Sequence, residues 1–309
     1  MMRALLYICV CLIAVACKNK KPVPTDTAET GTIHISVDET FKPIIEEQIQ
    51  VFQASWPKAK IIAEYKPEAE CWDDLLRDST RMVIVTRKLT QAETSYYYDS
   101  LSVYPTTGIL AQDAVALVVN REAKDSVFTK EEVAALLSGT SKLPYGLVFD
   151  GVKATSTVRF AIDSILKGGK LSTTTITAAK TSREVVEYIA ANPGYIGFVG
   201  ISWIGNPDDS SQTNLLKKLR IAWLPCDSCE EEGAYTKPWQ DEILTKRYPY
   251  VRDIVYVLKE NHAGLGKAFV NFMMSDRGQL IFRRGYLVPA WKIFMMRETK
   301  LKLVKPIQQ

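Results

Sequence analysis

The sequence predicts an α/β protein with two lobes, each a mostly parallel sheet flanked by helices, with a ligand cleft between them. Three observations support this prediction: apolar strands alternate with amphipathic helices, about 280 residues follow the N-terminal segments, and the alternation restarts midway along the chain. Near-continuous apolar strands beside amphipathic helices are typical of a sheet covered on both faces. A folded part of this length usually exceeds a single core, which favours two lobes.

The N-terminus reads MMRALLYICVCLIAVAC, one arginine and then an apolar run that ends in small residues. This layout is typical of a secretory signal peptide, and the run is too short to span a bilayer. Ala14 and Ala16 directly before Cys17 resemble a bacterial lipobox, so we expect residues 1–16 to be removed and Cys17 to carry lipid. Plain secretion and an uncleaved anchor are the alternatives. An uncleaved anchor would still leave the rest of the chain outside the cytoplasm.

Residues 17–30 are expected to form the lipidated cysteine and a flexible tether, because they carry Lys, Pro and Thr but no large apolar residue beyond Val23. Folding is expected to start near Gly31. The first part of lobe 1 is placed at 31–112, lobe 2 with its crossover strands at 113–247, and the return crossover with the end of lobe 1 at 248–309.

The first part of the folded chain consists of strand, loop and helix units. TIHISV (32–37) predicts a strand, and the next helix has Pro43 near its first position. That helix places Ile45, Ile49 and Phe52 on one face. Apolar runs predict further strands at 60–66, 81–87 and 113–120.

Two helix starts in the second part carry a Thr followed three residues later by a Glu, Thr129 with Glu132 and Thr181 with Glu184, which is the spacing of a capping box. A single amphipathic helix is predicted over 266–284. Strands are predicted at 147–149, 195–204, 219–225 and 248–258.

Charge and cysteine content exclude some classes of function. The formal net charge of +4 is spread along the chain, which argues against a nucleic-acid surface. The pair Cys226 and Cys229 lacks a second CxxC or a His pair, so a local disulfide or two free thiols is favoured over a zinc site. The sequence holds two His and no GxSxG, Walker A or dinucleotide motif, so we expect neither an enzyme nor a cofactor.

The segment Thr155-Ser156-Thr157 opens a predicted helix, with Arg159 one turn in. Helix starts offer unpaired N–H groups, so hydroxyls there either cap the helix or join those groups around an anion. Capping needs only one hydroxyl, and three in a row with an arginine make an anion site the competing interpretation.

Two further segments follow predicted strands, at the carboxyl ends where open α/β sheets place ligands. Thr86 and Arg87 follow an apolar strand, and the alternative for Arg87 is a surface pair with Glu93. The turn from Asp38 through Thr40 to Phe41 follows the first strand, and its alternative role is capping.

Read in order, these segments resemble the phosphate-binding proteins of ABC importers, the PstS-like branch of the type II periplasmic binding proteins. The family's Thr-Phe pair matches Thr40-Phe41, its Ser-Arg-Pro-Leu-like stretch matches 86–89, and its Ser-Gly-Thr helix start matches 155–157. The resemblance covers about Gly31 to Ala290 and is most specific in its last segment. Two departures stand out: EYKPE (64–68) replaces a Gly-Ser-Ser run, and no Asp follows the third strand.

The resemblance implies a two-lobed binding protein that closes around one oxyanion, preferably phosphate, and delivers it to the membrane permease of an ABC importer. It implies an extracytoplasmic, lipid-anchored monomer without a catalytic role. An acidic group that accepts a proton from phosphate would come from Asp38 or Asp113. Charge compensation is expected from Arg87, with Arg159 or Arg81 as alternatives. Sulfate, molybdate or tungstate, or a ligand-free adaptor that binds a protein, are the other interpretations.

Overall fold

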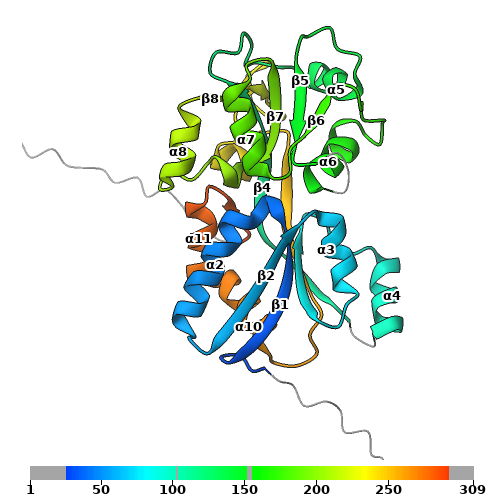
Figure 1. Ribbon diagram of the computed structural model, residues 1–309, viewed down its shortest axis with the longest axis vertical. Coiled ribbons are helices and arrows are strands. Elements are labelled where there is room, and N and C mark those ends of the chain that lie inside the picture. Colours follow the sequence, from blue (N-terminus) through cyan, green and yellow to red (C-terminus); the bar gives the residue numbers. More distant parts are fainter. Residues whose placement is uncertain (1–25, 102–103, 152–154, 292–309) are drawn as a thin grey trace, which may run out of the picture.

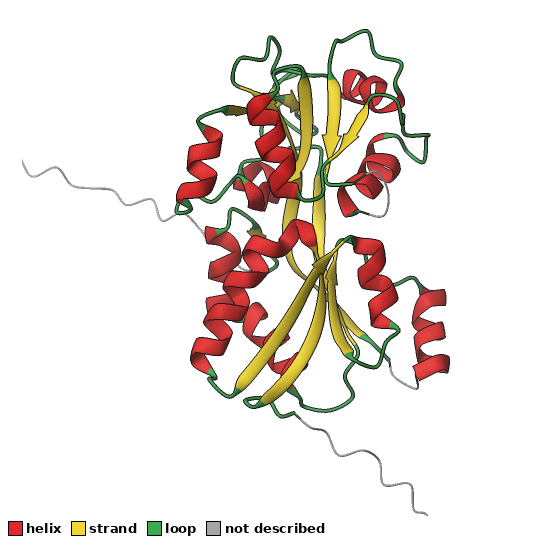
Figure 2. Ribbon diagram, in the orientation of Figure 1, coloured by secondary structure: helices red, strands yellow, loops and turns green. Residues whose placement is uncertain are grey.

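The computed structural model describes residues 26–101, 104–151 and 155–291. In this part of the chain, one sheet of ten strands passes through two halves of the molecule (Figure 1). Along the sheet the strand order is β2-β1-β3-β11-β4-β7-β5-β6, and β8 and β12 also pair with β4. Helices pack on both sides of the sheet in each half (Figure 2). The predicted two-lobed α/β fold is therefore confirmed.

The first lobe, the lower half of Figure 1, is built on parallel strands, since β1 pairs in parallel with β2 and with β3. The second halves of β1 and β3 are buried without interruption, as expected for strands covered on both faces. The elements of this lobe are β1 (Gly31–Asp38), α2 (Lys42–Ser55), β2 (Ala59–Lys66), α3 (Glu68–Leu75), β3 (Thr80–Val85), α4 (Gln91–Leu101), α10 (Leu265–Met274), α11 (Asp276–Arg284) and β12 (Val288–Pro289).

The second lobe repeats this scheme, with β5 parallel to both β6 and β7. Thr129 caps its first helix with the predicted capping box, and the hydroxyl of Thr181 caps a later one. Its elements are α5 (Lys130–Ser138), β5 (Gly146–Phe149), α6 (Ser156–Phe160), β6 (Ile176–Ala178), α7 (Ser182–Ala191), β7 (Tyr195–Gly200), α8 (Ser210–Leu216), β8 (Leu219–Ile221), β9 (Leu224–Pro225), β10 (Tyr235–Thr236) and α9 (Gln240–Leu244).

Two antiparallel strands connect the lobes. β4 (Thr106–Asn120) pairs with β11 (Val251–Leu258) along its first part and with β7 and β8 along its second part. β4 therefore runs from one lobe into the other, as Figure 1 shows. The chain thus crosses between the lobes in β4 and β11. The loops that follow the parallel strands of one lobe face those of the other, as hydrogen bonds from Thr40 to Asp150 and from Arg159 to Glu68 show.

The segment predicted as one helix over 266–284 is two helices, so that prediction was wrong. Ser275 has an extended backbone, with φ −73° and ψ 168°, and its hydroxyl accepts a hydrogen bond from the Gly278 N–H. A Cβ atom on Gly278 would lie 2.3 Å from the carbonyl oxygen of Phe272. The close junction requires glycine there, while the apolar period continues through the break and conceals it.

The folded part begins earlier than Gly31, which corrects the predicted end of the tether. Asp26 is buried, and its carboxylate accepts hydrogen bonds from the Arg81 guanidinium at 3.1 Å and from the Leu265 N–H at 2.7 Å. A turn closed by Thr27 and Thr30 leads from it into β1. The predicted signal peptide and Cys17 lie outside the described residues.

Cys226 and Cys229 form a disulfide, one of the two states that the sequence favoured, and Cys71 is buried with a free thiol. Among the described helices, none combines the length and the apolar character that crossing a bilayer requires.

Candidate binding site between the lobes

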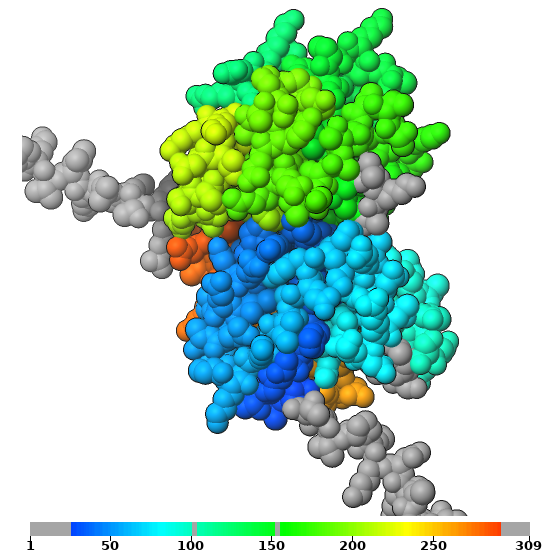
Figure 3. All heavy atoms as spheres, viewed as in Figure 1, coloured from blue at the N-terminus to red at the C-terminus, as the bar shows by residue number. Residues whose placement is uncertain are grey.

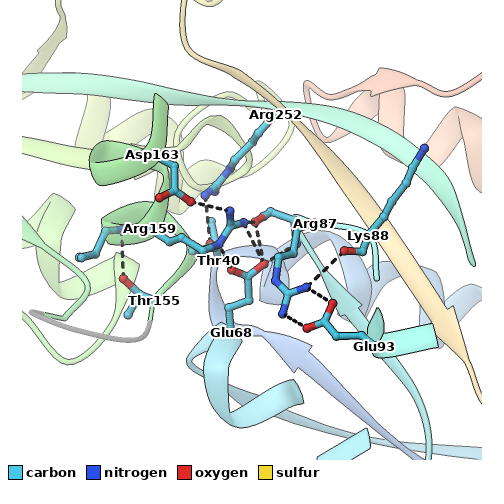
Figure 4. Close-up of polar contacts among 12 residues, drawn as sticks. Thr40, Glu68, Arg87, Lys88, Glu93, Thr155, Arg159, Asp163 and Arg252 are labelled. Atoms are coloured by element: carbon cyan, nitrogen blue, oxygen red, sulfur yellow. Dashed lines mark hydrogen bonds and ion pairs between the residues drawn. The ribbon is translucent and has the colours of Figure 1, made fainter. Parts of the chain in front are cut away.

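Polar residues gather at the carboxyl ends of the parallel strands. Asp38 ends β1, Glu68 and Thr86 follow β2 and β3, and Asp150 follows β5 of the other lobe. Carboxyl ends of parallel strands lie at one edge of a sheet, which is where open α/β folds bind ligands. Because the two lobes turn these edges toward each other, contacts cross the interface: Asp150 accepts from Thr40 of the first lobe, and Glu68 accepts from Arg159 of the second (Figure 4 shows the latter).

Hydroxyl groups from both lobes form the centre of the site. The Thr40 hydroxyl lies 3.4 Å from the Ser156 hydroxyl and donates to the Asp150 carboxylate at 3.4 Å. Thr157 donates to the same carboxylate at 3.3 Å, and so does Ser182 at 3.4 Å. All five of these side chains are buried. The structure therefore brings together the predicted Thr40, Ser156 and Thr157.

One buried ion pair borders these hydroxyls. Arg252 of β11 donates through Nε to the Asp113 carboxylate of β4 at 2.8 Å, and through Nη1 to the Ser156 hydroxyl at 3.0 Å. Its guanidinium carbon lies 5.4 Å from the centre of the Phe41 ring, which is fully buried. The predicted Asp113 and Phe41 thus both contact Arg252, an arginine that was not predicted as a site residue.

Several buried polar atoms in this cluster have no hydrogen-bond partner among the residues that the structure describes. They are Oδ2 of Asp38, Oδ1 of Asp113, Oδ1 of Asp150 and Nη2 of Arg252. Buried polar groups are usually satisfied, and an unsatisfied one costs about 1–3 kcal/mol. A group with both hydrogen-bond donors and acceptors would complement these four atoms.

The carboxyl groups of the cluster hold protons more tightly than usual. Burial is the main cause that raises the pKa of Asp38 to about 7; the nearby Glu68 carboxylate contributes to this rise, and the Arg252 charge opposes it. Burial also raises the pKa of Asp150, against hydrogen bonds from threonine hydroxyls. Asp38 additionally caps the turn at residues 39–41 by accepting from the Thr40 N–H at 3.0 Å.

A second polar group lies beside the first and centres on Glu68. This carboxylate accepts hydrogen bonds from the N–H and the hydroxyl of Thr86, each at 2.7 Å, and from Nε of Arg159 at 2.7 Å. Burial opposes ionisation of Glu68, but its hydrogen bonds and the Arg159 charge hold its pKa below the usual value. The predicted Thr86 and Arg159 therefore meet each other, with a carboxylate of the chain between them.

The structure does not bring Arg87 to either group. Its guanidinium makes two hydrogen bonds to Glu93, at 2.9 and 2.8 Å, and lies 4.2 Å from the centre of the Trp72 ring. Figure 4 shows this pair beside the interface. The surface pair that stood as the alternative is thus the arrangement found. Arg81 is also elsewhere, bound to Asp26.

Of the two roles predicted for Thr155, capping and anion binding, the structure shows capping: its hydroxyl caps α6 by accepting from the Val158 N–H at 3.3 Å. Asp150 and Arg252 were not predicted as site residues, although the sequence around each of them indicates such a role. Asp150 directly follows a predicted strand, as ligand residues often do. Arg252 is a charged residue inside an apolar β-rich run, which a strand tolerates only with a buried partner.

Comparisons with known proteins agree with this fold. The chain belongs to the family described as the PBP superfamily domain, which it matches over residues 22–277. No curated protein matches it in sequence. The fold is that of the type II periplasmic binding proteins.

Solved structures with this fold include two from phosphate transport. One is from Clostridium perfringens, assigned as a phosphate ABC transporter substrate-binding protein with bound phosphate; it is 18% identical, with a TM-score of 0.67, over 84% of this chain and 99% of that one. Another is an ABC-type phosphate transport receptor from Vibrio cholerae, 14% identical, with a TM-score of 0.61, over 83% and 99% of the two chains. These identities support a common fold, and the ligand has to be argued from the site.

Proposed function

We propose that this protein is an extracytoplasmic solute-binding lipoprotein, which captures phosphate between its lobes by hinge closure and delivers it to an ABC importer. The observation that carries the proposal is the set of unpartnered buried atoms of Asp38, Asp113, Asp150 and Arg252 around the Ser156 hydroxyl. Hydrogen phosphate supplies oxygens for the arginine and a proton for a carboxylate. Phosphate is also the ligand of the similar Clostridium perfringens structure.

The site favours phosphate over other tetrahedral oxyanions because of its carboxyl groups. Sulfate, molybdate and tungstate have only acceptor oxygens near neutral pH, so an ionised carboxylate opposes them. Asp38, whose pKa is about 7, can act as that carboxylate when the pH lies above this value. Neutral hydroxyl donors from Thr40, Ser156 and Thr157 suit either kind of anion. The carboxyl groups are therefore expected to decide between them.

The remaining parts of the proposal come from the sequence. Cys17 anchors the protein by lipid to a bacterial membrane, on the periplasmic or cell-surface side. The protein acts as a monomer beside the importer's permease. The lobes are divided at residues 112 and 247, and no reaction is catalysed.

A second function rests on Glu68. Its carboxylate uses donors of Thr86 and Arg159 that an oxyanion could have used. This favours an adaptor with the same fold that binds a protein and no solute.

Isothermal titration calorimetry separates these functions. Purified protein, cleared of bound ions by partial unfolding and refolding, is titrated with phosphate, sulfate and molybdate near pH 7.5 at fixed salt. A phosphate receptor gives heat with phosphate and at least tenfold weaker binding of sulfate. Equal binding of sulfate contradicts the role given to the carboxyl groups. No heat with any anion supports the adaptor.

A further inference from the structure

The carboxylate of Glu68 bridges the two lobes. It belongs to α3 of the first lobe and is only 2% exposed. Its Oε1 atom accepts from Thr86 of its own lobe at 2.7 Å, and both carboxylate oxygens accept from Arg159 of the other lobe, at 2.7 and 3.3 Å. In Figure 4, Arg159 extends from its helix to Glu68 across the interface.

A second carboxylate of the first lobe does the same at another point of the interface. Glu39 accepts hydrogen bonds from the Ser182 N–H at 3.1 Å and from its hydroxyl at 2.7 Å. Ser182 begins α7, so this contact joins the turn after β1 to the second lobe. On the face shown in Figure 3, the blue atoms of the first lobe lie directly against green atoms of the second.

These contacts have a consequence for the state without solute. In a cleft that closes only around a solute, the hydrogen-bond donors on the walls lose their partners when the solute leaves. The lobes then separate, and water molecules take the place of the solute as partners. Here the donors of Thr86, Arg159 and Ser182 have carboxylate partners within the chain. Burial of Glu68 strengthens its attraction to Arg159, although the Arg159 side chain is 34% exposed and water screens part of the attraction.

We infer that Glu68, with Glu39, holds the two lobes closed in the absence of solute, and that these contacts leave the hydroxyls of Thr40, Ser156 and Thr157 for a ligand. This inference rests on the proposed function only in assuming that solute is captured at the interface between the lobes. Glu68 is then a positioning residue: it keeps the binding walls together, and a solute does not have to close them. Closure that is already present raises apparent affinity, because no binding free energy is used to populate the closed state.

The test measures the distance between the lobes without solute. Spin labels are attached at Asp78→Cys and Lys170→Cys, two exposed positions on opposite lobes, in the full chain carrying Cys17→Ser so that no lipid is present. Pulsed dipolar spectroscopy on the parent should give one short distance, unchanged by phosphate. Glu68→Gln should broaden and lengthen the distribution, and Glu39→Gln combined with Glu68→Gln should lengthen it further.

The matched control is Glu187→Gln, which removes a carboxylate whose arginine partner, Arg183, lies in the same helix. It should leave the distance unchanged. A parent chain that is already open without solute, or a double variant that stays closed, overturns the inference. Because no solute is present, this result is independent of whether the chain binds phosphate.

Affinity adds a second readout if phosphate binds. The double variant has to close before it can bind, so its phosphate affinity should fall at least fivefold. A rise in affinity would mean that Glu68 competes with the solute, and it overturns the positioning role.

Discussion

The Nη1 atom of Arg252 donates a hydrogen bond to the Ser156 hydroxyl at 3.0 Å, although the two residues stand 96 positions apart in the chain. Arg252 lies on the return crossover β11, and Ser156 opens a short helix of the second lobe. The same arginine pairs with Asp113 on the other crossover. One guanidinium therefore connects both crossovers to the wall of the proposed binding site.

Replacing Arg252 with Gln should lower the free energy of unfolding by about 3–5 kcal/mol, because the Asp113 carboxylate is then buried without its partner. Asp113→Asn combined with Arg252→Gln should restore much of this loss, since no unpaired charge remains. Urea denaturation at neutral pH measures both effects. If the single variant is as stable as the parent, the pair does not have the structural role assigned to it.

Thr157→Val should weaken phosphate binding by about fivefold, or about 1 kcal/mol, because one buried hydroxyl is lost beside Asp150. Arg87→Ala should change binding less than about twofold, since its guanidinium is held by Glu93. The sequence alone assigned charge compensation to Arg87, which would make the loss with Arg87→Ala the larger of the two. Calorimetry on both variants at fixed salt compares them, and a larger loss with Arg87→Ala would restore Arg87 as a ligand.

Asp38→Asn should flatten the dependence of stability on pH. Burial raises the pKa of Asp38 from 3.8 to about 7, so the folded chain keeps a proton that the unfolded chain releases. The stability gained from this proton is complete below the lower pKa and is lost as the pH rises through the higher one. Without solute, the unfolding free energy of the parent should therefore fall between about pH 4 and pH 7.5 more steeply than that of the variant. Equal slopes would show that Asp38 ionises normally.

Replacing both Cys226 and Cys229 with Ser should leave phosphate affinity within a few-fold of the parent, because the backbone of their loop bonds to Ala234 and Arg247, which are not residues of the proposed site. Stability should fall by up to about 2 kcal/mol, since the disulfide closes a short loop. Calorimetry and thermal unfolding measure the two effects. A large loss of affinity with little loss of stability would mean that the loop takes part in binding.

Cys17→Ser should release the mature protein from the membrane, because the residues that follow have no apolar surface to hold it there. Fractionation of cells that express the parent and the variant, with detection of each in membrane and soluble fractions, tests this. Retention of the variant in the membrane fraction after signal removal would contradict lipid anchoring.

The sequence by itself determined the fold class, because local patterns carry it. Apolar runs of strand length and capping residues such as Thr129 and Thr181 depend only on neighbours in the chain. Reliance on local patterns also explains the wrong prediction over 266–284, because the apolar period of the helix continues through the break at Ser275.

Only the tertiary structure decided which polar residues meet. Thr40, Ser156 and Arg252 are far apart in the sequence and come together because two crossovers bring the strand ends of separate lobes face to face. The sequence favoured Arg87 over Arg159 for charge compensation, since Arg87 follows a predicted strand at its carboxyl end. Packing gave Arg87 to a neighbouring glutamate and Arg159 to a carboxylate of the opposite lobe, because the partner of a long charged side chain depends on which surfaces are buried together.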